Sequence, residues 1–282
     1  PYTGQLTIFR IFSGTLSGDT LFNSSRAVSE KFSQVQLLEG KNLTQANGAG
    51  PGMIVALTDR ERSLQISTYG LADVAAGLPV MPETMFEIGS ISKSFTAIAL
   101  LQLVQTGAAD LHAPVTRYLP WFHLPSQHEP IALHHLLSHT AGLINGSEGS
   151  AEARFEVWAL RETEAGWPPG IRFYYSNVGY KLLGLVLETL LGQSYGEIIQ
   201  ARILDPLGMA CAEPVITHAT RPRLAVGYTT LYDDRPPHPG HRLVPATWLE
   251  TGTADGSIAA TAADMALYLR ALMNCLLYTS DA

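Results

Sequence analysis

The segment Phe86–Thr96 reads Phe-Glu-Ile-Gly-Ser-Ile-Ser-Lys-Ser-Phe-Thr, and the apolar run in its second half continues to Val104. The run predicts a helix over residues 92–106. Ser90 would then lie at the N-terminus of this helix, where free N–H groups and the positive end of the helix dipole favour developing negative charge. Lys93 follows three residues later, so its side chain is expected on the same face and within reach of the Ser90 hydroxyl.

This spacing suits a serine nucleophile with a lysine base. A serine hydroxyl attacks well only when a base removes its proton, and a lysine does so when burial or neighbouring cations disfavour its ammonium form. A four-residue pattern of this kind is also common by chance. An ordinary helix start followed by a solvated lysine explains it equally well, so a second element is needed to choose.

That second element is Phe173-Tyr-Tyr-Ser-Asn177, which precedes a predicted helix over residues 178–191. In an extended turn Tyr175 and Asn177 point to the same side. A tyrosine beside a lysine can relay a proton to a leaving group, and an asparagine amide can hold a substrate carbonyl and orient the lysine. The alternative is a core tyrosine followed by an asparagine that caps the helix, a task that Asn177 could combine with the first.

Four motifs occur in one order along the chain: Phe86–Thr96, Leu136-Leu-Ser-His-Thr-Ala-Gly-Leu143, Pro168-Pro-Gly170 and Tyr175-Ser-Asn177. Together they resemble the serine β-lactamase family, in its class C branch, with relatives among D-alanyl-D-alanine peptidases and esterases. The resemblance covers residues 51–274. A Ser-Asp-Asn motif is absent from the sequence, which disfavours a class A enzyme.

The resemblance implies roles for four side chains. Ser90 would attack a carbonyl to form an acyl-enzyme, Lys93 and Tyr175 would share the acid–base work, and Asn177 would position the substrate. The backbone N–H of Ser90 would be one donor of the oxyanion hole. Neither a cofactor nor a metal is part of this chemistry.

The expected fold class is α+β, of the β-lactamase and transpeptidase type: an antiparallel sheet with helices, plus a helical subdomain. Strands are predicted at 53–58 and 64–70, and mostly helices follow, which favours α+β over alternating βαβ units. Further helices are predicted at 133–138, 195–203 and 262–274, and Thr261 with Asp264 fits a capping box at the start of the last one.

The first 50 residues follow a different pattern, with short strands predicted near residues 5–12, 20–23 and 33–38. Gly4-Gln-Leu-Thr-Ile-Phe-Arg-Ile-Phe-Ser-Gly-Thr-Leu16 and Gly48-Ala-Gly-Pro-Gly52 resemble the β-barrel second domain of translation elongation factor G. A translation-factor fragment, a binding module without enzymatic activity, is therefore the rival interpretation. The sequence contains no Gly-rich phosphate loop of a GTPase domain.

Both ends of the chain depart from a simple domain. Residues 275–282 resemble a translated sequencing adaptor, so we expect three parts: a barrel fragment over 1–50, a hydrolase domain over 51–274 and a non-native tail. The family's third motif is expected after the helix at 262–274. His238-Pro-Gly240 matches the residue types of this motif, but it precedes that helix and lies in a predicted loop. On this interpretation one oxyanion donor is missing, which typically costs about 10²–10³ in rate, and activity is impaired.

Composition excludes several other classes. The formal charge is −7 and the pI near 5.7, which argues against nucleic acid as a partner. The longest apolar run is far too short to span a bilayer. Two distant cysteines, Cys211 and Cys275, predict neither a disulfide framework nor a zinc site. His134, His135 and His139 fit a structural landmark of the family better than a metal site, because an acidic third ligand is missing nearby.

The expected partner is a small-molecule or peptidyl substrate: a β-lactam, a D-alanyl peptide or a small ester. A penicillin-recognising protein that acylates without turnover is a further alternative. Oligomeric state and compartment stay open, although family members are often periplasmic or secreted.

Overall fold

The computed structural model of the chain describes residues 16–17, 20–23, 28–31, 50–146, 152–232 and 242–275. The predicted strands at 5–12 and 33–38, the loop that contains His238 and the tail from residue 276 lie outside these ranges. The described residues form two compact units: those within 16–86, 224–247 and 261–270 make the first, and those within 87–223, 248–260 and 271–275 make the second. Among the described helices, none is long and apolar enough to cross a membrane.

The first unit consists mainly of antiparallel strands. Its earliest described strands are β1 (Leu16–Ser17), β2 (Thr20–Asn23) and β3 (Val28–Lys31), in the order β1-β2-β3. The predicted strand at 20–23 is thus confirmed. Further pairs join β6 (Leu71–Asp73) to β7 (Leu78–Pro79) and β9 (Tyr228–Thr230) to β10 (Leu243–Pro245).

The predicted hairpin at 53–70 is confirmed as β4 (Met53–Thr58) and β5 (Ser63–Tyr69). Asp59 stabilises the charged turn between the two strands. Its Oδ1 accepts hydrogen bonds from the backbone N–H groups of Glu61 and Arg62 at 2.8 and 2.7 Å. These two bonds lower the pKa of Asp59, since they stabilise its ionised form.

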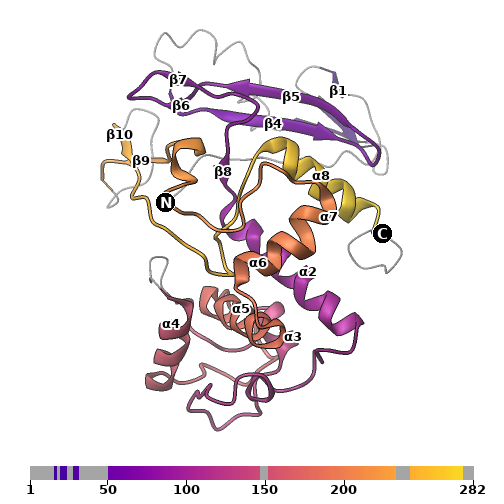
Figure 1. Cartoon of the computed structure of the whole chain (residues 1–282), viewed down its shortest axis with the longest axis vertical. Helices are drawn as coiled ribbons and strands as arrows, with labels where there is room; N and C mark the ends of the chain where they lie inside the picture. Colours follow the sequence, from indigo (N-terminus) through magenta and orange to yellow (C-terminus); the bar gives the residue numbers. More distant parts are fainter. Residues whose placement is uncertain are drawn as a thin grey trace. The chain divides into compact units, whose positions relative to one another are not determined.

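Helix α8 (Ala262–Met273) lies along this hairpin (Figure 1). Arg270 donates to the Thr58 and Ser63 hydroxyls at 3.1 and 2.9 Å, and the buried core between helix and strands includes Ile54, Ala56, Val80, Phe86 and Ala262. The predicted capping box is confirmed: Asp264 Oδ2 accepts from the Thr261 N–H, and Thr261 Oγ1 accepts from the Asp264 N–H.

The second unit is mostly helical. Strand β8 (Phe86–Glu87) leads into it, the short strand β11 (Ala259–Ala260) leaves it, and its longest helices are α2 (Ser92–Gln105) and α5 (Asn177–Leu191). The shorter elements are η2 (Gly89–Ile91), η3 (Val115–Arg117), α3 (Leu133–Leu137), α4 (Ala153–Ala159), η4 (Leu160–Glu162), α6 (Tyr195–Ile199), the π-helical turn η5 (Gln200–Leu204), α7 (Asp205–Leu207) and η6 (Arg221–Arg223).

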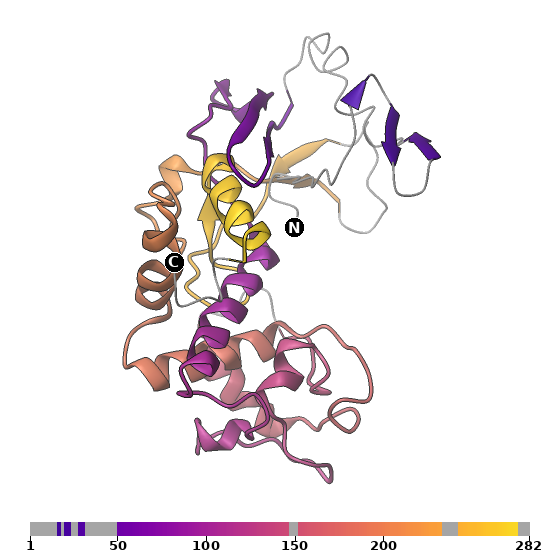
Figure 2. The same ribbon diagram turned by 90° about the vertical axis from the view of Figure 1, so that its right-hand side faces the viewer.

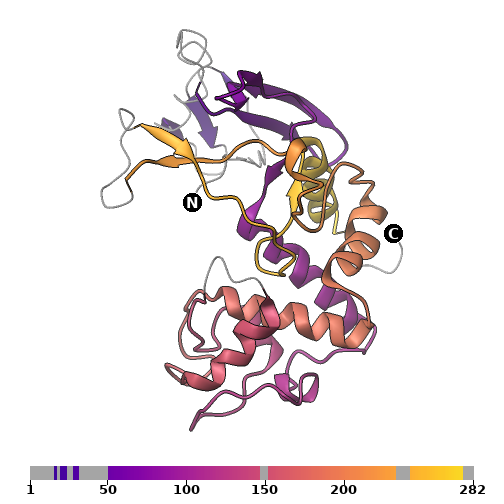
Figure 3. The ribbon, with the colours of Figure 1, turned by 60° about the vertical axis from the view of Figure 1, so that its left-hand side comes forward.

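Helix α5 is the centre of this unit. Nearly all of its first eleven residues are buried, so it is covered on every side by its neighbours. It packs against α2 and α6 (Figure 2) and against α3 and α4 (Figure 3). The lack of a side chain at Gly184 allows the segment that contains Ala254 to lie directly against α5. A Cβ at position 184 would lie 2.5 Å from the Cβ of Ala254. The expected α+β fold class is confirmed by this architecture of antiparallel strands and helices.

Candidate active site

Ser90 lies in a short 3₁₀ turn, η2, immediately before α2. Gly89 takes a positive φ of 52°, which a glycine adopts without strain, and this sends the chain from β8 into the turn. The backbone of Ile258 binds the residues on both sides of this turn. Its carbonyl accepts from the Ile88 N–H at 3.0 Å, and its N–H donates to the buried Ser92 hydroxyl at 3.1 Å. Ser90 itself is exposed.

Lys93 lies one turn further along, in the first turn of α2, and is almost wholly buried with 5% of its surface exposed. Its Nζ donates to Ser90 Oγ at 3.2 Å, to Asn177 Oδ1 at 2.8 Å and to the carbonyl of Asp255 at 2.6 Å. The three bonds use all the donors of an ammonium group. The three acceptors belong to three separate segments of the unit, and together they fix the lysine beside the serine.

Tyr175 approaches the serine from the other side. Its hydroxyl donates to Ser90 Oγ at 2.7 Å, and its ring lies 4.9 Å from Lys93 Nζ. A second tyrosine, Tyr180, has its ring 5.7 Å from the same nitrogen, but its hydroxyl donates to the carbonyl of Leu137. Burial and then the neighbouring Tyr175 raise the pKa of Tyr180 to about 12. Of the two phenols, the one that can exchange a proton with the serine is therefore Tyr175.

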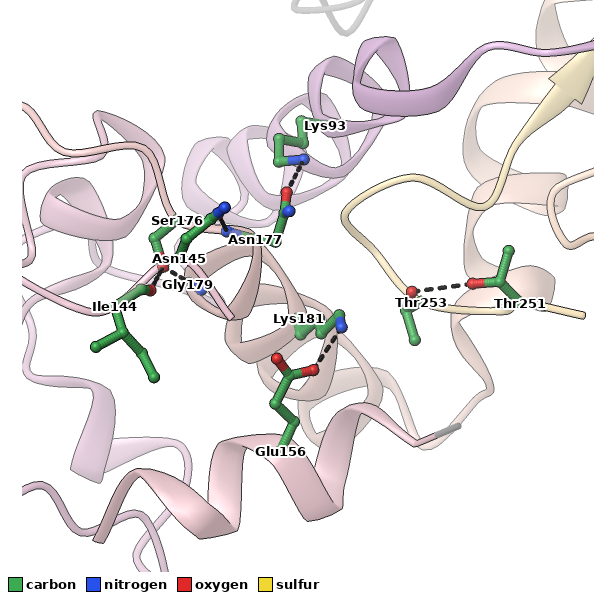
Figure 4. Close-up of polar contacts among 10 residues, drawn as sticks. All are labelled: Lys93, Ile144, Asn145, Glu156, Ser176, Asn177, Gly179, Lys181, Thr251 and Thr253. Carbon is green, nitrogen blue, oxygen red and sulfur yellow. Dashed lines mark hydrogen bonds and ion pairs between the residues drawn. The ribbon is translucent and has the colours of Figure 1, made fainter. Parts of the chain in front are cut away.

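Asn177 is 4% exposed and is the first residue of α5. Figure 4 shows its side chain directed at Lys93. The expectation that Asn177 also caps the helix is wrong, because the N-cap is Ser176, whose hydroxyl accepts from the Gly179 N–H at 3.1 Å. The Ser176 hydroxyl also donates to the carbonyl of Ile144 at 2.7 Å. Because Ser176 caps the helix, the Asn177 amide is available to the site.

The segment 144–146 holds the start of α5 in place. The carbonyl of Asn145 accepts from the N–H groups of Asn177 and Val178 at 2.8 and 3.1 Å, and Asn145 Oδ1 lies 3.2 Å from the Asn177 nitrogen (Figure 4). These contacts satisfy N–H groups that have no partner inside the helix. They also fix the backbone position of Asn177, from which its side chain reaches Lys93.

The four residues predicted from sequence thus lie together, with Ser90 Oγ between Lys93 and Tyr175. Sequence reasoning missed the Asp255 carbonyl, Asn145 and Ser176 as parts of this arrangement. A backbone carbonyl carries no signature in the sequence. Ser176 had one, since a serine directly before a helix is a preferred N-cap.

The histidines considered for a metal have other roles. His135 Nδ1 accepts from the Ala132 N–H at 3.1 Å, and His139 Nδ1 accepts from the Ser176 N–H at 3.1 Å. Within the part of the chain that the structure describes, no group of three or more His, Cys, Asp or Glu side chains is arranged to hold a metal ion.

Burial lowers the pKa of His139, and the positive charge of Lys93 adds to the effect. The unfolded chain therefore binds a proton at this site at a higher pH than the folded one does. As the pH falls below the ordinary histidine value of 6.5, the unfolded state holds more protons and the free energy of unfolding decreases. We expect the melting temperature to drop between about pH 7 and pH 5, and thermal unfolding followed by circular dichroism checks it. His139→Asn should flatten this part of the curve, and an unchanged slope in that variant would contradict the assignment.

Comparisons with known proteins give two family matches. The family model described as Beta-lactamase matches residues 41–279, and the model described as Elongation factor G domain 2 matches residues 1–68. Protein flp of Staphylococcus aureus is 31% identical over 187 residues, which cover 63% of this chain and 38% of that protein. A beta-lactamase of Yersinia enterocolitica is 30% identical over 226 residues, covering 79% and 55%. The chain thus spans 38% of the length of the first relative and 55% of the length of the second.

Solved structures show the same fold. The octameric penicillin-binding protein homologue from Pyrococcus abyssi superimposes with a TM-score of 0.71 at 30% identity, covering 86% of this chain and 56% of that one. The penicillin-binding protein from Bacillus halodurans gives 0.67 at 27% identity, covering 82% and 72%.

Proposed function

Because the chain belongs to the beta-lactamase family, we propose that it is a serine hydrolase that forms an acyl-enzyme through Ser90 on an amide or ester substrate. One observation carries the proposal: Ser90 Oγ accepts hydrogen bonds from both Lys93 Nζ and Tyr175 Oη, at 3.2 and 2.7 Å. A serine hydroxyl held between two groups that exchange protons is the arrangement that nucleophilic catalysis requires.

In the proposed reaction, one of Lys93 and Tyr175 first releases its proton to solvent, and it then accepts the Ser90 hydroxyl proton as Ser90 Oγ attacks the substrate carbonyl. The tetrahedral intermediate collapses when this proton is delivered to the leaving nitrogen or oxygen, which leaves the acyl group on Ser90. A water molecule then repeats the sequence and releases the acid. Asn177 and the Asp255 carbonyl keep Lys93 directed at the serine, and Asn177 also contacts the substrate.

Negative charge develops on the substrate oxygen in each tetrahedral state. We assign the Ser90 backbone N–H as one of its donors, since the residue lies just before the first turn of α2, where N–H groups are not used by the helix. The expected substrates are those of the family: a β-lactam, a D-alanyl peptide or a small ester. The relatives named as a beta-lactamase and as penicillin-binding proteins support the first of these, the β-lactam.

The residues proposed for catalysis all lie within 51–274, and we propose that this part is the hydrolase domain. We propose that residues 1–50 are a further β segment, which the match of the Elongation factor G domain 2 model to residues 1–68 supports. A binding role for residues 1–50 is the second candidate function. It does not compete with the first, because it concerns different residues.

Covalent labelling tests the proposed function. The chain is incubated separately with a fluorescent penicillin, a peptide ending in D-alanyl-D-alanine and a p-nitrophenyl ester, then quenched in acid and digested. We expect the penicillin to leave an acyl group on the peptide that contains Ser90, detected by mass spectrometry. Rapid release of that group identifies a hydrolase, whereas a stable adduct identifies a penicillin-recognising protein. Label on another residue, or none from any of the three probes, contradicts the proposal.

A further inference from the structure

His139 contacts three consecutive residues of the segment that carries Tyr175. Its backbone carbonyl accepts from the Tyr174 N–H at 2.7 Å, and its Nδ1 accepts from the Ser176 N–H at 3.1 Å. Between these two bonds its imidazole stacks on the ring of Tyr175, with centroids 4.5 Å apart and an angle of 30° between the planes. One residue thus holds Tyr175 by its ring and by both of its neighbours.

The backbone of His139 is in the left-handed region, with φ at 56°. It follows Ser138, the C-cap of α3, and glycine or asparagine is the usual residue at this place after a helix. A histidine is less favourable there than a glycine, because its Cβ crowds the following carbonyl oxygen. The contacts of His139 with residues 174–176 compensate for this backbone cost.

The ionisation state of His139 fits these contacts. Nδ1 can accept from the Ser176 N–H only when it carries no proton. Burial, followed by the nearby charge of Lys93, lowers the pKa of His139 and keeps the ring neutral. The ring of Tyr180 is also close, with centroids 5.0 Å apart, so the imidazole packs between two tyrosines.

The Tyr175 hydroxyl reaches Ser90 from a side chain that is 36% exposed. An exposed phenol would move among several rotamers unless its ring were packed. We propose that His139 is a positioning residue, which fixes the Tyr175 ring and so holds the phenol at hydrogen-bond distance from Ser90. This inference rests on the proposed function, and it adds a residue that acts through Tyr175 without contacting the reacting atoms.

A double-mutant cycle tests the role in catalysis. His139→Asn tolerates the positive φ and offers Oδ1 as an acceptor for the Ser176 N–H, but it has no ring to stack on Tyr175. We expect the rate of Ser90 acylation in this variant to fall by about 10- to 100-fold, within the range of a lost acid–base contribution. KM is expected to change little. In the Tyr175→Phe background, His139→Asn should add less than about threefold, because the hydroxyl that it positions is gone.

The matched control is His123→Asn, since His123 is an exposed histidine in the same unit and has no part in the site. Its acylation rate should equal that of the unchanged chain. Full additivity of His139→Asn and Tyr175→Phe, or a loss in His139→Asn that merely follows a loss of folded protein in thermal unfolding, overturns the inference.

A second measurement does not depend on turnover. The imidazole carbons are labelled with ¹³C, and the His139 signal is identified by its disappearance in His139→Asn. In Tyr175→Leu this signal should shift, because the stacked ring current is removed, whereas in Tyr174→Leu it should stay in place, since the Tyr174 ring packs on Trp167. A His139 signal that ignores Tyr175→Leu overturns the inference. If no probe acylates Ser90 while this shift is observed, the proposed function fails and the contact between His139 and Tyr175 stands.

Discussion

Ser90→Ala is expected to abolish acyl-enzyme formation and to lower any hydrolysis of a chromogenic β-lactam or ester by roughly 10⁴- to 10⁶-fold. The reason is that the side chain that forms the covalent bond is gone, while Lys93 and Tyr175 lose the oxygen that both contact. Burst kinetics and intact-protein mass spectrometry measure the effect. Since Ser90 is exposed, the substitution leaves no cavity and the melting temperature should change little.

Ser126→Ala is the control for this experiment. Ser126 is an exposed serine of the same unit, and its hydroxyl accepts a local hydrogen bond from the His128 N–H. Its acylation rate should match that of the unchanged chain. If a fluorescent penicillin labels Ser90→Ala as strongly as Ser126→Ala, the nucleophile is a residue other than Ser90.

Lys93→Met and Lys93→Arg are expected to lower the acylation rate by about 10³-fold or more, because the serine loses its base. Methionine has a similar length but no donor, so Asn177 Oδ1 and the Asp255 carbonyl lose their bonds as well. Arginine retains the positive charge and the donors but does not release a proton. Comparing the two variants therefore separates proton transfer from charge and from hydrogen bonding.

Stopped-flow acylation by a chromogenic cephalosporin, with circular dichroism to confirm folding, measures both variants. If Lys93→Arg acylates at nearly the rate of the unchanged chain, Lys93 is not the base, and its task is to hold Asn177 and Ser90 in place. Slow acylation in both variants, with the secondary structure retained, supports proton transfer by Lys93.

Local sequence predicted the parts of the site that depend on neighbours along the chain. Ser90 and Lys93 are three residues apart at the start of a helix, so helical geometry alone brings their side chains together, as the 3.2 Å separation confirms. The strands at 53–58 and 63–69 and the capping box at Thr261 follow for the same reason. Each rests on a turn, a cap or a hydrophobic period of a few residues.

The prediction was less accurate where two local possibilities competed. Both Ser176 and Asn177 are good helix caps, and the sequence does not say which residue takes the position. The structure assigns it to Ser176, because its hydroxyl also bonds to the carbonyl of Ile144. The helix expected over 195–203 ends at Ile199 and continues as a π-helical turn, a change that apolar periodicity does not detect.

The sequence by itself determined the position of Ser90 beside Lys93, the two longest helices and the family of the chain, since these depend on short motifs and on hydrophobic spacing. The tertiary structure alone decided how the site is assembled. Asn177 and the Asp255 carbonyl reach Lys93 across 84 and 162 positions of the chain, and His139 reaches Ser176 across 37. Such contacts depend on how closely α5 packs on α2 and α3, and this is fixed by the fit of many buried side chains at once.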